Sequence, residues 1–148
     1  MKIGIIVAMD KELRQLQSLF NDGNVRVEKC GIGKVNAALG AQRMINEFHP
    51  DCIISSGCAG GHGDDVNIQD VVVGAEVGYH DVYCGRAIDD STVYGQVQGM
   101  PARFKADPYL LSKCAEMECP FVSWQYQRSA LPVAPMTIPS PTFPSRMR

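Results

Sequence analysis

Short apolar runs alternate with helix-like periods along the first part of the chain. Lys2 to Ala8 is apolar and stops at the polar stretch Met9-Asp10-Lys11-Glu12, and Asp51 to Ser56 stops at the glycine-rich stretch Gly57 to Gly61. A short apolar run that ends at polar or glycine residues is typical of a buried parallel strand followed by a turn. The pattern therefore predicts two strands with functional turns at their carboxyl ends.

Two amphipathic segments and one further strand lie between these runs. The first segment has apolar residues at helical spacing and ends at Asn21-Asp22-Gly23-Asn24; its apolar residues are Leu13, Leu16, Leu19 and Phe20. Val25 to Cys30 is predicted to be a strand. The second segment begins after Gly31-Ile32-Gly33-Lys34 and ends at His49-Pro50. Its predicted sheet-facing residues are Val35, Ala38, Leu39, Gln42 and Ile45.

The resulting strand-helix-strand-helix-strand order predicts a parallel sheet with right-handed crossovers. Sheets of this kind bind ligands at the carboxyl ends of their strands. Asp70 to Val77 is predicted to be a further strand that ends before Tyr79-His80-Asp81. Cys84 to Phe104 is loop-rich. Asp107 to Glu118 is a short helix with Asp107 as its N-cap and Pro108 in its first turn.

The stretch from Pro120 to Arg148 differs from the rest of the chain. It has six prolines in 29 residues and no Gly, Asp or Glu. Proline at this density disfavours a central strand or a long helix. We predict that residues 1–119 are the N-terminal part of one domain and that residues 120–148 are a Pro-rich irregular tail outside the native fold. A reading-frame change after about Cys119 is one hypothesis for this composition.

Composition narrows the classes of function. The 148 residues are 45% hydrophobic and 20% charged, which is typical of one globular domain with a core. A net charge of -2 gives no reason to expect a nucleic acid or an anionic membrane as partner. No apolar run has membrane-spanning length. Six cysteines without a Cys-x-x-Cys pair indicate a reducing cytoplasm.

Glu12 is the main candidate for chemistry. It follows the first strand at the start of a helix, where a carboxylate could reach a water held against a ligand. The alternative is a solvated first-turn glutamate favoured by the helix dipole, and Asp10 carries the same ambiguity.

Other motifs are less specific. Gly31-x-Gly33-x-x-Asn36 matches the dinucleotide fingerprint only in part, because its sixth position is neither Gly nor Ala. Gly57 to Gly61 would let a ligand approach backbone N–H groups closely.

Cysteine and histidine side chains leave alternatives open. Cys58 is either a nucleophile or a packed, inert thiol, and His80-Asp81 is either an acid–base pair or a strand end with local hydrogen bonds. His49 and His62 are predicted to lie at the surface. Three scattered histidines predict no metal site.

Five segments in order resemble the 5′-methylthioadenosine/S-adenosylhomocysteine nucleosidases of the purine nucleoside phosphorylase-like superfamily: MKIGIIVAMDKEL, CGIGKVNAALGAQ, PDCIISSGCAGG, DVVVGAEVGYHD and YGQVQGMPARFKAD. The resemblance covers roughly residues 1 to 107. It implies a three-layer α/β fold with a mixed, mostly parallel sheet and flanking helices, incomplete at the C-terminus. It also implies hydrolysis of the N-glycosidic bond of an adenine thio-nucleoside, without a cofactor or metal, by a homodimer.

The resemblance also implies roles for residues. Glu12 would position and deprotonate the attacking water, and the segment Val93 to Pro101 would reach the 5′ pocket of a neighbouring subunit. Residues beside the ribose, thioalkyl group or base would be Ala8, Met9, Ile32, Cys58, Ala59 and Gly60, with Cys58 where relatives have serine.

Two departures from the family pattern give rise to an alternative. Cleaving a ribosyl C–N bond needs a carboxylate on the water side and an acid at the purine. Nothing after Cys119 matches the family's acidic Asp or the Met-Glu pair that holds the ribose, and the segment between the first helix and second strand is short. The alternative is an inactive fragment that binds adenine nucleosides or a partner subunit. An unrelated dinucleotide-binding module is the third possibility.

Overall fold

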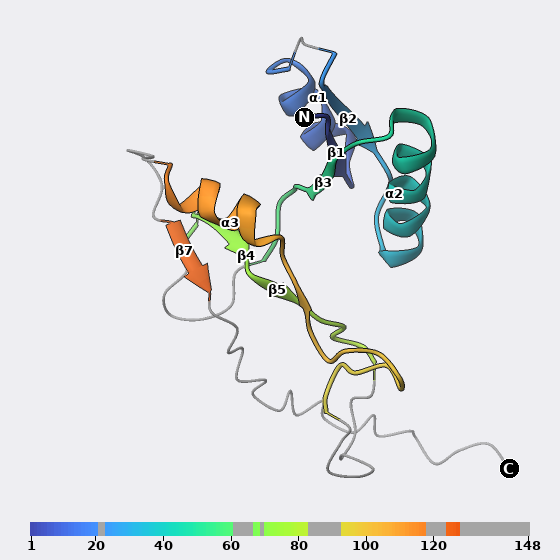
Figure 1. Cartoon of the computed structure of the whole chain (residues 1–148), viewed down its shortest axis with the longest axis vertical. Coiled ribbons are helices and arrows are strands. Elements are labelled where there is room, and N and C mark those ends of the chain that lie inside the picture. Colours follow the sequence, from blue (N-terminus) through green and yellow to red (C-terminus); the bar gives the residue numbers. More distant parts are fainter. Residues whose placement is uncertain (21–22, 61–66, 69, 83–92, 118–123, 128–148) are drawn as a thin grey trace, which may run out of the picture. The chain divides into compact units, whose positions relative to one another are not determined.

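The computed structural model describes residues 1–20, 23–60, 67–68, 70–82, 93–117 and 124–127 (Figure 1). The chain divides into two compact units, Met1–Gly61 and His62–Arg148. We describe each unit by itself.

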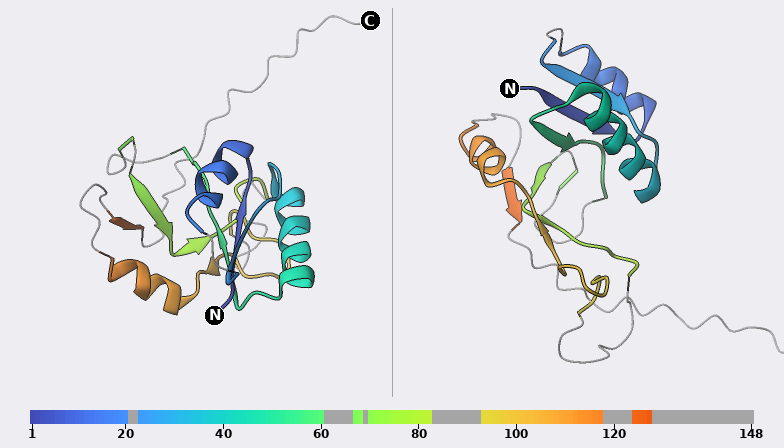
Figure 2. Two further views of the ribbon diagram at one scale, coloured as in Figure 1. Left: turned by 90° about the horizontal axis from the view of Figure 1, so that it is seen from above. Right: turned by 45° about the vertical axis from the view of Figure 1, so that its right-hand side comes forward.

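The first unit is a parallel sheet between two helices. Its elements are β1 (Ile3–Val7), α1 (Asp10–Gln17), β2 (Val25–Lys29), α2 (Lys34–Phe48) and β3 (Cys52–Ser55). The strands lie in the order β2-β1-β3, and Ile3 of β1 pairs with Val25 on one side and Cys52 on the other. The two crossovers run in opposite directions along the sheet, so right-handed connections place α1 and α2 on opposite faces. Figure 2 shows this arrangement and confirms the predicted order of elements.

The central strand β1 forms the core of this unit. Ile5, Ile6 and Val7 are exposed by only 6%, 7% and 1%, as expected for a strand covered on both faces. Gly4 allows Met44 of α2, which is fully buried, to approach the strand: a Cβ at Gly4 would lie 2.9 Å from the Met44 Cγ. The core therefore depends on close contact between α2 and β1.

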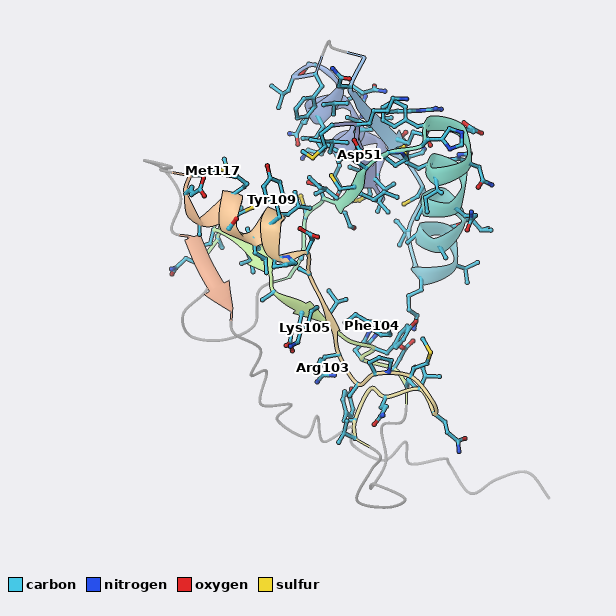
Figure 3. The ribbon with its side chains drawn as sticks, viewed as in Figure 1. Asp51, Arg103, Phe104, Lys105, Tyr109 and Met117 are labelled. Carbon is cyan, nitrogen blue, oxygen red and sulfur yellow. The ribbon has the colours of Figure 1, made fainter. Side chains whose placement is uncertain are left out.

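The start of the sheet is fixed by hydrogen bonds between Lys2 and Asp51. The Lys2 backbone N–H donates to Asp51 Oδ2 over 2.7 Å, and the Asp51 N–H donates to the Lys2 carbonyl over 2.8 Å. Asp51, labelled in Figure 3, directly precedes β3. These bonds align β1 and β3 at their amino ends.

The predicted sheet-facing side of α2 is wrong. All five of its residues are exposed: Val35, Ala38, Leu39, Gln42 and Ile45. The buried or half-buried residues are instead Ala37, Gly40, Ala41, Met44 and Phe48. A Cβ at Gly40 would lie 2.3 Å from the Cys30 Cβ, so the helix lies against the end of β2 at this point. The apolar period alone allowed both sides, and close contact at Gly40 selects the second.

The first helix is shorter than predicted. α1 ends at Gln17, and Leu19 and Phe20 lie beyond it with 69% and 38% of their surface exposed. The Ser18 hydroxyl donates to the Gln15 carbonyl over 3.0 Å, a local bond that competes with helix continuation. Only Leu13 and Leu16 of the predicted apolar side are half-buried.

The second unit contains β4 (Val71–Gly74), β5 (Glu76–Val77), β6 (Phe104–Lys105), α3 (Pro108–Ala115) and β7 (Trp124–Gln127). β4 pairs with β7 in parallel, and β5 pairs with β6 in antiparallel fashion. The predicted single strand from Asp70 to Val77 is therefore wrong, because the chain changes its pairing partner at the buried Ala75. β7 lies within residues 120–148, in a short stretch that has no proline.

The third helix begins as predicted. Asp107 Oδ1 accepts a hydrogen bond from the Leu110 N–H over 3.0 Å, and Pro108 occupies the first turn. α3 ends at Ala115, three residues before the predicted end at Glu118.

The segment before α3 packs against the chain that follows β5. The rings of Tyr79 and Phe104 meet edge to face with centroids 6.3 Å apart. Gly95 has a φ of 80°, and a Cβ there would lie 2.2 Å from the Tyr79 carbonyl oxygen, so this close approach requires glycine. Figure 3 labels Phe104 on this segment, with its sequence neighbours Arg103 and Lys105.

We expect Met44→Ala and Leu39→Ala to differ sharply in stability. Removing the fully buried Met44 side chain should lower the free energy of unfolding by about 2–5 kcal/mol. Removing the Leu39 side chain, which is 65% exposed, should change it by about 0.5 kcal/mol or less. Urea unfolding of the full chain measures both, and equal losses would contradict the observed orientation of α2.

Candidate active site

The strand order defines where a ligand site belongs in the first unit. The strand that follows β1 in the sequence, β2, lies on one side of it, and β3 lies on its other side. The direction in which strands are added therefore reverses, and the reversal falls between β1 and β3. Open α/β sheets bind ligands outside the carboxyl ends of strands at such a point. Here those ends lead into Ala8-Met9 after β1 and Ser56-Gly57-Cys58 after β3.

Glu12 bridges these two strand ends. Its Oε2 accepts hydrogen bonds from the Ala8 N–H over 3.1 Å and from the Met9 N–H over 2.9 Å. Its Oε1 accepts a hydrogen bond from the Cys58 N–H over 2.9 Å. The residue is only 6% exposed. The alternative of a solvated first-turn glutamate is therefore wrong for this position.

Hydrogen bonding fixes the ionisation of this carboxyl group. The Cys58 N–H and then the Met9 N–H lower the pKa of Glu12, burial acts in the opposite direction, and the Ala8 N–H lowers the pKa further. Backbone donors favour the charged form because they stabilise the anion. Glu12 is consequently an anion at neutral pH.

The two oxygens of Glu12 differ in the number of hydrogen bonds that they accept from the backbone. An ionised carboxylate has about four acceptor positions, two on each oxygen. Oε2 accepts from two N–H groups and Oε1 from one. Among the described residues no donor occupies the remaining position, which is on Oε1 beside Gly57 and Cys58 and can accept a proton or a hydrogen bond from water.

Asp10 differs from Glu12 although both lie in the first turn of α1. Asp10 Oδ1 accepts from Lys29 Nζ over 2.7 Å, and the pKa of Asp10 is lowered by this hydrogen bond and the charge of Lys29. The Asp10 side chain is 68% exposed. It is a surface ion pair and lies outside the bridge between the strand ends.

The other predicted binding residues lie at the same edge of the sheet. Ala8 is half-buried and Met9 is 38% exposed, and both donate backbone N–H groups to Glu12. Cys58, Ala59 and Gly60 are exposed in the turn after β3. Ile32 is 71% exposed in the turn after β2.

Gly57 is a residue of this site that sequence reasoning missed as an individual position. A Cβ at Gly57 would lie 2.8 Å from Glu12 Oε1. Its position directly after the predicted third strand was a signal that the sequence contained. The contact with Glu12 could not be predicted, because the two residues are 45 positions apart in the chain.

The remaining candidates lie elsewhere or outside the described residues. His80 and Asp81 are exposed and belong to the second unit. His49 is exposed at the end of α2, as predicted. His62, Cys84 and Cys119 lie outside the described residues. Cys30, Cys52, Cys58 and Cys114 are free thiols.

Two features are absent from the residues that the structure describes: a cluster of metal-binding side chains and a membrane-spanning helix. Among these residues, no group of three or more His, Cys, Asp or Glu residues could hold a metal ion. No helix in this part of the chain has the length and apolar character needed to cross a membrane.

The sheet, its two covering helices and the carboxylate at the reversal of strand order define the first unit as a three-layer α/β structure with a buried anion at its strand ends. The chain belongs to the phosphorylase superfamily, whose family model matches residues 2–136. This membership confirms the resemblance found in the sequence and the predicted fold class.

Similar proteins carry a consistent description. A 5′-methylthioadenosine/S-adenosylhomocysteine nucleosidase from an Exiguobacterium species is 39% identical over 139 residues, with 79% of this chain and 57% of the relative covered. One from a Geobacillus species is 40% identical over 138 residues, with 78% and 56% covered. The chain spans a little over half the length of the curated relatives it matches.

Solved structures of such nucleosidases have the same fold. The Streptococcus pneumoniae protein with a transition-state inhibitor has a TM-score of 0.72 at 27% identity, covering 84% of this chain and 61% of that one. The Colwellia psychrerythraea protein in complex with adenine has a TM-score of 0.68 at 31% identity, covering 78% and 54%.

We expect Glu12 to make stability depend on pH. Its folded-state pKa is lowered, so its contribution is fully present above the unfolded pKa of about 4.3 and is lost as pH falls through the folded value. Glu12→Gln should therefore be less stable than the parent at about pH 7, and the two should converge towards about pH 3. Urea unfolding of both chains across this range is the measurement, with exposed Glu47→Gln as the control. A difference that is independent of pH would contradict the assignment.

Proposed function

We propose that this chain contributes the water-activating side of an N-ribosyl hydrolase site that acts on 5′-methylthioadenosine and S-adenosylhomocysteine and releases adenine. The observation that carries the proposal is the buried, ionised Glu12 at the carboxyl ends of β1 and β3, where the strand order reverses. The nucleosidases that this chain resembles support the choice of reaction and substrate.

The chemistry assigned to Glu12 is proton acceptance from water. The water oxygen forms a bond to the ribose C1′ while the C–N bond to adenine breaks, and the bonding electrons move onto the purine. Glu12 takes the proton that the water loses, and the purine gains one from an acid on its own side. The oxocarbenium-like transition state carries positive charge, which a fixed anion stabilises.

The local geometry supports Oε1 as the oxygen that accepts this proton. Within the described part of the chain, Oε2 accepts two backbone hydrogen bonds and Oε1 accepts one. Oε1 also lies beside the turn after β3, where Gly57 to Gly60 are exposed. A water held there would contact both the carboxylate and a ligand at the strand ends.

The substrate contacts in this proposal follow the sequence resemblance. Ala8 and Met9 would line the ribose, and Ile32 the thioalkyl or ribose region. Cys58, Ala59 and Gly60 would lie beside the ribose and base. Residues 93–101 would reach the 5′ pocket of a partner subunit in a homodimer. The four cysteines that the structure describes are free thiols, which fits a reducing compartment, and we propose the cytoplasm.

The acid at the purine is the requirement that Glu12 does not meet. The resemblance implies that in family members an Asp has this role, and that this Asp follows the segments that the chain matches. A chain without that acid could still bind an adenine nucleoside. The inactive-fragment alternative therefore makes the same binding prediction and differs only in turnover.

We expect the full chain to release little adenine from methylthioadenosine, because no residue of it is assigned as the acid at the purine. Glu12→Gln should reduce the kcat that remains by about 10²–10⁴-fold, because a general base contributes about this much. The amide keeps the size of the side chain but cannot accept the proton. Adenine release followed by chromatography measures the rate, and nucleoside binding is measured in parallel by calorimetry.

Glu47→Gln is the matched control because Glu47 is an exposed glutamate of the same unit. Nucleoside binding without turnover by the parent would support the inactive fragment. Binding of NAD but of no adenine nucleoside would support the dinucleotide module, and equal turnover by the parent and Glu12→Gln would contradict the role of Glu12.

A further inference from the structure

Gly57 lies at the point where a side chain would displace the Glu12 carboxylate. An added Cβ would be 2.8 Å from Oε1, 3.2 Å from Cδ and 3.4 Å from Oε2 of Glu12. Real Cβ atoms essentially never come within 3.0 Å of such a neighbour, so one of the two groups must move. The backbone of Gly57 is not among those with positive φ, so its conformation does not itself require glycine.

The group that moves would be the carboxylate. Oε1 is the end of a side chain, whereas the position of residue 57 is set by β3 and by the Ser56 N–H, which donates to the Ile6 carbonyl over 3.0 Å. Moving Oε1 away from residue 57 also moves it away from the adjacent Cys58 N–H, which is its backbone donor among the described residues. The bond at risk is therefore the one that ties Glu12 to the turn after β3.

We propose that Gly57 is a positioning residue of the active site, whose missing side chain keeps Glu12 Oε1 in place and open to the water that Glu12 deprotonates. This inference rests on the proposed function for its catalytic consequence, but the placement of the carboxylate can be tested without substrate. Gly57 acts through Glu12 and takes no part in the proton transfer.

The test compares Gly57→Ala with Gly23→Ala in the full chain. Gly23 is the matched control, because it is exposed, a Cβ there meets nothing within 4 Å, and its φ is not positive. The first readout is the pKa of the Glu12 carboxyl group, titrated by carbon NMR in glutamate-labelled protein and assigned by its absence in Glu12→Gln. The second readout is kcat and KM for adenine release.

We expect Gly57→Ala to raise the pKa of Glu12 above its value in the parent, because the Cys58 N–H is the largest cause of the lowered pKa. Gly23→Ala should leave this pKa unchanged. A displacement of about 1 Å should reduce kcat by about 10²-fold, with a smaller change in KM. The pH below which turnover falls should rise together with the pKa.

Each outcome separates this inference from the proposed function. An unchanged Glu12 pKa in Gly57→Ala overturns the role of Gly57, whatever the turnover. A raised pKa in a chain that releases no adenine supports the placement and counts against the hydrolase. A loss of stability without a change in pKa would show that Gly57 is merely structural.

A double variant covers the case in which Gly57→Ala fails to fold. In Glu12→Ala/Gly57→Ala the carboxylate is absent, so the new methyl group no longer meets it. The double variant should then be as stable as Glu12→Ala in urea. If the added methyl group destabilises both backgrounds equally, the contact with Glu12 is not what requires glycine, and the proposal is overturned.

Discussion

The carboxylate of Glu12 joins the two strand ends that form the site. It accepts N–H groups from the turn after β1 and from the turn after β3, which lie in separate parts of the sequence. Backbone N–H groups that are withdrawn from water need acceptors, and here one ionised side chain accepts from three partly buried ones. The same bonds that hold the turns together therefore keep the anion in position and ionised.

Close backbone packing makes this bridge geometrically feasible. Gly4 lets Met44 approach the central strand, Gly40 lets α2 approach Cys30 after β2, and Gly57 leaves room for the carboxylate. The first two contacts fix the layers of the sheet and helix, and the third fixes the site. All three contacts depend on the absence of a Cβ at the glycine, so stability and the site share one packing constraint.

The sequence predicted the order of elements in the first unit, the start of α3 and the strand ends where the site lies, because local patterns and turn residues determine these features. It did not predict which side of α2 is buried, since two apolar stripes fit the helical period and contact with Cys30 selects one. It did not predict the break at Ala75, where the strand changes partners. The burial of Glu12 also depended on a distant segment, the turn at Gly57-Cys58, which the spacing of residues does not show.

A lowered pKa weakens Glu12 as a base, yet it suits the proposed reaction. The transition state for glycosidic cleavage gains positive charge on the ribose before the water proton has fully moved. An immobile anion stabilises that charge without reorganising, and three backbone donors ensure that it is charged at neutral pH. The two oxygens then have different roles in the proposal: Oε2 holds the side chain on the turn after β1, and Oε1 would accept the hydrogen bond from water. A stronger base held by fewer donors would give up that fixed placement, and placement contributes more to such a reaction than basicity alone.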